Sequence, residues 1–160
     1  AAAGISGPGV YRHFASKHAL LEALCDRAMT RMLAGAHGIS AGAIDAHEAL
    51  AQLVELHVDF AVTERALIGV WVREQRSLSD DVRRSLRRRQ RDYEQPWREV
   101  LSSLRDDLSP PEVALAVTST LTMLNATALA EVELPAEKSR RLLTRMALSA
   151  LLSRRAPQRR

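Results

Sequence analysis

The stretch from residue 4 to residue 21 constrains the fold most, because it places two helix starts close together. Gly4 provides a turn, and Ser6 is a suitable N-cap for a very short helix that carries Tyr11. Ser16 then caps a longer helix. Two helices joined in this way are typical of the second half of a helix-turn-helix. The plainer interpretation is a helical hairpin whose polar residues only face water.

The remainder of the chain carries the pattern of amphipathic helices. Apolar residues recur at spacings of three and four rather than two, and no Asn-Gly or Asp-Gly hairpin signal occurs. Further N-cap signals stand at Asp45, Ser79 and Ser109, the first and last with a glutamate three residues on. We therefore expect an all-α fold with helices at about 7–13, 16–35, 46–62, 64–76, 79–107, 110–131 and 136–154.

Three local features refine this expectation. Gly35, Gly38 and Gly42 predict that the second helix ends near residue 35 and that 34–42 forms a loop. The segment 64–76 is apolar nearly all round, which predicts a centrally buried helix. Pro96 lies inside a long helix and predicts a kink around residues 92–96.

Composition bounds the class of protein. The chain is 46% hydrophobic and 26% charged, which is the balance of a soluble globular protein, and its net charge of +4 permits an anionic partner. The longest apolar run, Val113 to Ala130, is interrupted by hydroxyl and amide residues, so we expect no membrane span. The first residues show no signal-peptide pattern, and the single Cys25 predicts a buried, inert thiol; both favour the cytoplasm.

Catalytic and metal-binding patterns are not evident. The histidines share no metal-site spacing with cysteines or carboxylates, and no nucleophile has an evident base. We therefore expect no enzyme activity, no metal and no cofactor. His57 lies on the inward face of its helix, where it is either a satisfied core residue or faces a ligand. Both interpretations stay open.

The opening stretch resembles the recognition helix and following helix of the TetR family of bacterial transcriptional repressors. The residues that carry the resemblance are Gly4, Tyr11, His13, Phe14, Ser16, Lys17, Leu20 and Leu21. Members of that family begin with a full helix and most of a second before the glycine turn. The resemblance thus implies that a supporting helix precedes Ala1, and we do not expect a polypeptide lacking it to bind DNA.

The resemblance implies that residues 1–42 are the remainder of a DNA-binding domain with its connecting helix. A helix N-terminus with exposed backbone N–H groups can bind a phosphate. Glycines have no side chain and so let the main chain approach a duplex closely. Tyr11, His13 and Lys17 are implied phosphate contacts, whereas Arg12 is the side chain best able to read a base. The predicted contacts with a double-stranded DNA operator are Ser6, Gly7, Gly9, Tyr11, Arg12, His13 and Lys17.

The resemblance also implies that residues 43–160 bind an effector and form a dimer. Its middle helices would enclose a pocket for a small apolar effector, although each lining candidate is otherwise an ordinary core residue. The arginines between residues 83 and 91 suggest a phosphate clamp for an acyl-CoA, or only a solvated helix face. The predicted lining residues are Phe60, Ile68, Trp71, Val72, Gln75, Tyr93, Trp97, Met123 and Asn125.

The last two helices would form a four-helix bundle with a two-fold mate. The predicted interface residues are Leu121, Leu124, Ala128, Leu142, Leu143, Met146 and Ala150. We therefore expect a homodimeric, ligand-responsive repressor. The alternatives are a helical small-molecule-binding protein or enzyme without DNA-binding activity, and a structural helical dimer without a cavity.

Overall fold

The computed structural model describes residues 16–74, 79–130 and 134–153, and within these ranges every regular element is helical. The elements are α2 (Lys17–Gly42), α3 (Ala46–Thr63), α4 (Arg65–Glu74), α5 (Asp80–Leu104), α6 (Pro110–Ala126), the 3₁₀ turn η2 (Thr127–Leu129) and α7 (Ala136–Leu152). The predicted all-α class is confirmed.

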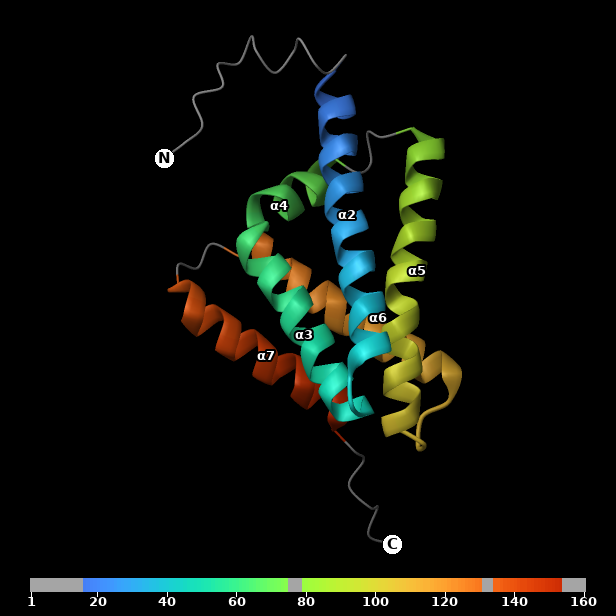
Figure 1. Ribbon diagram of the computed structural model, residues 1–160. Helices are drawn as coiled ribbons and strands as arrows, with labels where there is room; N and C mark the ends of the chain where they lie inside the picture. The colour runs from blue at the N-terminus through green and yellow to red at the C-terminus, as the bar shows by residue number, and fades with distance from the viewer. Residues whose placement is uncertain (1–15, 75–78, 131–133, 154–160) are drawn as a thin grey trace, which may run out of the picture.

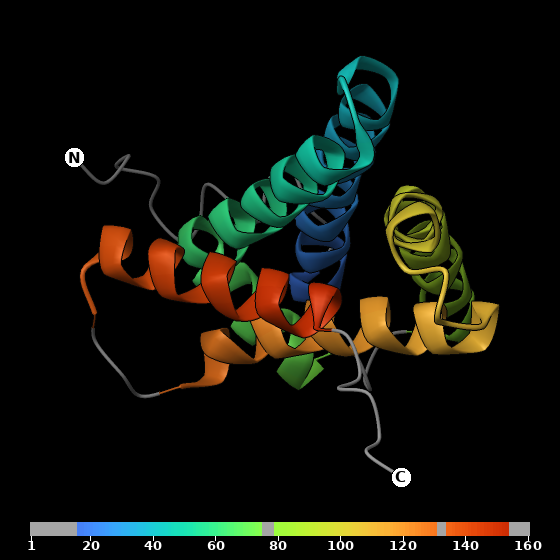
Figure 2. The same cartoon turned by 90° about the horizontal axis from the view of Figure 1, so that it is seen from below.

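Helix α3 is the central element. It packs against α2, α4, α5, α6 and α7, and α2 also lies along α5 (Figure 1). Helices α6 and α7 run side by side across the bundle, as the view from below shows (Figure 2). The main core lies where these helices meet, around the fully buried side chains of Trp97, Leu50, Leu53, Leu101 and Leu124.

The predicted helix starts are confirmed by their caps. The Ala19 amide donates to Ser16 Oγ at 3.1 Å, and the Glu48 amide donates to Asp45 Oδ1 at 2.8 Å. The Ser109 amide donates to Glu112 Oε2 at 2.8 Å, completing the glutamate side of the predicted capping box. Each bond satisfies a backbone donor that the helix itself leaves unpaired, so local residues set where these helices begin.

The predicted end of the second helix near residue 35 is wrong, because α2 continues to Gly42. Ala36 is fully buried and Ile39 packs against the core, so tertiary burial outweighs the weak helix propensity of glycine. A Cβ added at Gly35 would lie 3.0 Å from Leu56 Cδ2, whereas one at Gly38 would meet nothing. Gly35 thus permits a close approach of α2 to α3.

Two other expectations change. Helix α4 is not centrally buried: only Ile68 and Gly69 are buried, and Val70 is 37% exposed. It covers the bundle with one face instead. Helix α5 is continuous through the buried Pro96, so the kink near residues 92–96 stays a prediction.

One stretch of the described residues, Pro110–Leu129, is long and apolar enough to cross a membrane by length and composition alone, and 28% of its apolar window is buried. This is weak evidence for a membrane span. A helix that packs on the core with one face and exposes apolar side chains on another gives the same pattern.

Candidate functional site

A cavity of about 470 Å³ lies between α2, α3, α4, α5 and α6. Most of its wall is apolar, and the volume is that of a small-molecule site. Its lining residues are Cys25, Ala28, Met29, Met32, His57, Phe60, Leu67, Ile68, Trp71, Val72, Arg83, Leu86, Arg87, Gln90, Tyr93, Leu121, Thr122, Asn125, Ala126 and Leu129. A structural dimer without a cavity is therefore excluded.

Helix α4 closes one side of this cavity with the inner face that carries Ile68, Trp71 and Val72. A side-chain contact from Arg65 to the Ala130 carbonyl ties the start of α4 to the end of η2. Arg73 Nε donates to the Gly69 carbonyl at 2.9 Å, within the same helix. Only one face of α4 is apolar and enclosed, which explains why it is a cover rather than a core helix.

A chain of hydrogen bonds crosses three helices in the wall of the cavity. His57 Nδ1 lies 3.0 Å from Tyr93 Oη, and His57 Nε2 lies 3.2 Å from Asn125 Oδ1. Burial lowers the pKa of His57 from 6.5 to about 4 and raises the pKa of Tyr93, so both groups are neutral at pH 7. His57 is thus both a satisfied buried histidine and a cavity residue.

The arginines near the start of α5 differ in their partners. Arg83 and Arg87 line the cavity, and Arg83 also pairs with Asp80. Arg84 pairs with Asp81, and Arg89 pairs with Asp26 of α2, so these two are engaged elsewhere. Arg87 is therefore the arginine best placed to meet a cavity ligand.

Helix α2 supplies one wall of the cavity through Cys25, Ala28, Met29 and Met32. Arg89 also donates to Thr30 Oγ1, and so fixes α2 against α5. The thiol of Cys25 is half-buried rather than buried, and burial raises its pKa. The neutral thiol predominates at pH 7, so Cys25 acts as a wall residue.

The predicted pocket residues fall into three sets. Phe60, Ile68, Trp71, Val72, Tyr93 and Asn125 line the cavity. Trp97 and Met123 do not: Trp97 is fully buried in the core, and Met123 packs against that core from another face of α6. Gln75 lies outside the described residues.

Sequence reasoning missed the wall that α2 contributes. Met32 belongs to the apolar stripe of its helix, but nothing in the stripe distinguishes a residue beside a cavity from one in solid core. It also missed Leu67, Leu86 and Gln90. Their positions follow from the packing of α4 and α5, which the sequence pattern does not specify.

The predicted interface residues also divide. Leu121, Leu124 and Leu143 are 5%, 0% and 7% exposed, so they belong to the protomer's own core and have no surface for a partner; this part of the prediction is corrected. Ala128 is half-buried, whereas Leu142, Met146 and Ala150 are exposed on α7. Residues 117, 121 and 124 lie on the buried face of α6, which explains why Leu121 and Leu124 cannot contact a partner.

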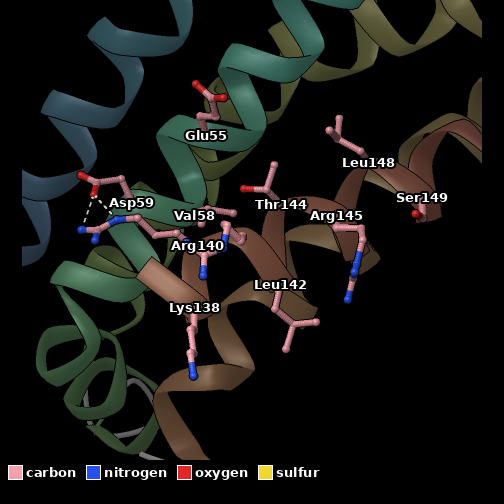
Figure 3. A pocket seen from close by; sticks show the side chains of 11 residues that line it. Glu55, Val58, Asp59, Lys138, Arg140, Leu142, Thr144, Arg145, Leu148 and Ser149 are labelled. Atoms are coloured by element: carbon pink, nitrogen blue, oxygen red, sulfur yellow. Dashed lines mark hydrogen bonds and ion pairs between the residues drawn. The ribbon is translucent and has the colours of Figure 1, made fainter. Parts of the chain in front are cut away.

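A second hollow is an open groove of about 1020 Å³ between α3 and α7. Arg140 reaches Asp59 across it at 2.9 Å, while Lys138 and Arg145 point away from α3 (Figure 3). The groove is more open to solvent than the first cavity, and charged side chains of both signs stand along it, so it lacks the enclosure that a small ligand needs.

Six of the predicted DNA contacts, Ser6, Gly7, Gly9, Tyr11, Arg12 and His13, lie outside the described residues. Lys17 is the first residue of α2. Within the described ranges, no group of three or more histidine, cysteine or acidic residues is arranged to hold a metal ion.

Comparison with known proteins places this geometry in a family. Residues 43–129 match the model of the tetracyclin repressor-like C-terminal domain, and residues 1–24 match that of bacterial regulatory proteins of the tetR family. No curated protein matches the chain.

Solved structures share the fold. A TetR-family transcriptional regulator from Bordetella parapertussis 12822 has a TM-score of 0.78 at 22% identity, covering 91% of this chain and 77% of that chain. A regulatory protein in the tetR family from Rhodococcus RHA1 has a TM-score of 0.74 at 21% identity, with 91% and 78% covered. The regulator PfmR from Thermus thermophilus has a TM-score of 0.72 at 23% identity, with 91% and 82% covered. Because the family model spans more than half of the sequence, the chain belongs to the TetR family of DNA-binding transcription regulators, which are not enzymes.

Proposed function

We propose that this regulator is a cytoplasmic repressor that binds its operator as a homodimer and is released by a small molecule in the cavity. The observation that carries the proposal is the double role of α2. Its first residues lie within the segment that matches DNA-binding regulators, and its middle forms a wall of the cavity. A ligand that moves this wall changes the placement of the DNA-binding segment.

The effector needs a different affinity for two positions of α2, because a ligand that binds both equally shifts nothing. In the present arrangement α2 is held to α5 through Arg89 and to the end of α3 through Arg31, which lies 2.9 Å from Glu64. These exposed pairs are individually weak, on the order of 1 kcal/mol or less. A ligand that displaces α2 therefore has to break only weak ion pairs at these two positions.

The effector is apolar over most of its length, because methionine, leucine and aromatic side chains dominate the wall. Arg87 adds positive charge to the lining and favours an effector with an anionic group, such as an acyl-CoA. A thermal-shift series with acyl-CoA thioesters tests this, and a saturating ligand raises the melting temperature. An unchanged melting temperature across the series would reject the acyl-CoA assignment.

The dimer forms through the outer faces of α6 and α7. Leu115 on α6 and Leu142 and Met146 on α7 are 68%, 37% and 41% exposed, and exposed apolar side chains on two neighbouring helices are typical of an interface. Sedimentation at micromolar concentration measures the assembly, and Leu142→Arg should shift it to the monomer. A monomeric wild-type protein would contradict this proposal.

The cavity is tested separately by filling it. Ile68 lines the cavity from α4 and is only 5% exposed, so it is not part of the exposed faces of α6 and α7. Ile68→Trp should therefore block ligand binding and leave the dimer intact. Unchanged ligand-induced stabilisation in a folded Ile68→Trp variant would place the ligand elsewhere.

A further inference from the structure

The polar groups of the cavity have a defined direction of hydrogen bonding. Asn125 Oδ1 only accepts hydrogen bonds, so the proton of the neutral His57 ring is on Nε2. His57 Nδ1 then accepts the hydroxyl proton of Tyr93. The chain therefore runs from Tyr93 through His57 to Asn125.

With this direction of hydrogen bonding, the amide N–H groups of Asn125 are left without an acceptor in the Tyr93–His57–Asn125 chain. The side-chain N–H groups of Asn125 make no hydrogen bond to any residue that the structure describes, and Asn125 lines the cavity. Thr122 differs, because its hydroxyl already donates to the Thr118 carbonyl at 2.7 Å.

The Tyr93–His57–Asn125 chain is also uncharged. A carboxylate buried against it would lose its hydration without gaining an opposite charge, which is strongly unfavourable. A neutral oxygen loses much less hydration and regains a hydrogen bond from the amide. The uncharged groups around Asn125 thus favour a ligand with a neutral hydrogen-bond acceptor over one with a carboxylate.

Starting from the proposed function of the cavity as the effector site, we propose that Asn125 recognises a neutral carbonyl oxygen, such as that of a ketone or ester, within an otherwise apolar ligand. Any anionic group of the ligand lies toward Arg87. Arg87 lines the cavity from α5 and Asn125 lines it from α6. The carbonyl group and any anionic group of the ligand are accordingly separate groups that contact different helices.

The test uses three eight-carbon probes, octane, 2-octanone and octanoate, titrated against the whole chain. Trp71 lines the cavity, so its fluorescence reports binding. Asn125→Leu removes the free donors at similar size. Thr122→Val is the matched control on the same helix, since it removes a hydroxyl that is already bonded within α6. Circular dichroism and melting temperature check that both variants fold.

We expect Asn125→Leu to weaken 2-octanone binding about tenfold, the effect of one lost hydrogen bond of about 1.4 kcal/mol. Octane binding should stay unchanged, and Thr122→Val should affect no probe selectively. Equal changes for ketone and alkane in Asn125→Leu, or a loss of octanoate binding in Asn125→Leu as large as the loss of 2-octanone binding, would overturn the inference. If no probe binds wild type, the proposed effector site itself fails.

A spectroscopic measurement on the wild type covers the case in which Asn125→Leu does not fold. The carbonyl stretch of ¹³C-labelled 2-octanone should move to lower frequency on binding than in an alkane solvent, because a donated hydrogen bond weakens the C=O bond. A bound carbonyl at the alkane frequency would show that no donor reaches it and would overturn the inference.

Discussion

Burial of a neutral His57 makes the stability of the folded chain depend on pH in a calculable way. Its pKa falls from 6.5 in the unfolded chain to about 4 in the fold, because burial disfavours the charged ring. As the pH decreases below 6.5, the unfolded chain binds this proton first. The free energy of unfolding is therefore not reduced by His57 above pH 6.5, and it decreases through His57 as the pH falls from 6.5 toward 4.

The size of the loss follows from the two pKa values. Between pH 7.5 and pH 5.0, protonation of the unfolded chain alone removes about 2 kcal/mol from the free energy of unfolding. Other groups titrate over this range, so the quantity to measure is the difference between wild type and His57→Gln. Glutamine keeps hydrogen-bonding capacity at this position and does not titrate.

Urea denaturation at both pH values, with both proteins at the same concentration, measures this difference. Wild type should lose about 2 kcal/mol more than His57→Gln between pH 7.5 and pH 5.0. If the two proteins lose the same amount, His57 is not held neutral in the fold, and the reasoning about the uncharged end of the cavity is refuted.

Three further substitutions test the packing. Gly38→Ala should stabilise the chain by up to about 1 kcal/mol, as measured by urea denaturation, because α2 is helical there and space is open. Gly35→Ala should gain less, because its Cβ meets Leu56 at 3.0 Å; an equal gain would contradict the close approach of α2 to α3. Arg105 is buried and donates to Asp107 at 2.7 Å and to the Leu151 carbonyl at 2.7 Å, so Arg105→Leu should destabilise by about 2 kcal/mol in the same assay. A loss below about 0.5 kcal/mol would show that this tie between α5 and α7 is unimportant.

The helix starts were predictable because their causes are local. A cap such as Asp45 or Ser109 satisfies backbone donors within three residues of itself, so the sequence contains both partners. The end of α2 was not predictable on the same basis. Its glycines favour a loop locally, but the burial of Ala36 against distant helices decides the outcome.

The cavity was predictable in part. Phe60 and Asn125 were proposed from the helical pattern together with the family resemblance, and both line the cavity. The pattern could not separate Trp97, which fills the core, from Tyr93, four residues earlier on the same stripe. Likewise, Leu121 and Leu124 have the composition of an interface but face inward. A periodic stripe identifies the buried side of a helix without specifying what covers it.

Coupling between the cavity and DNA is the central claim, and one binding measurement tests it most directly. Fluorescence anisotropy would follow the binding of the full-length protein, including the supporting helix expected before Ala1, to duplex DNA from upstream of its own gene over a range of salt concentrations, with and without saturating 2-octanone. The account predicts that the logarithm of the affinity falls linearly with the logarithm of the salt concentration, and that the ligand lowers the affinity at every salt concentration. Salt-independent binding, or superimposable curves with and without the ligand, would contradict it.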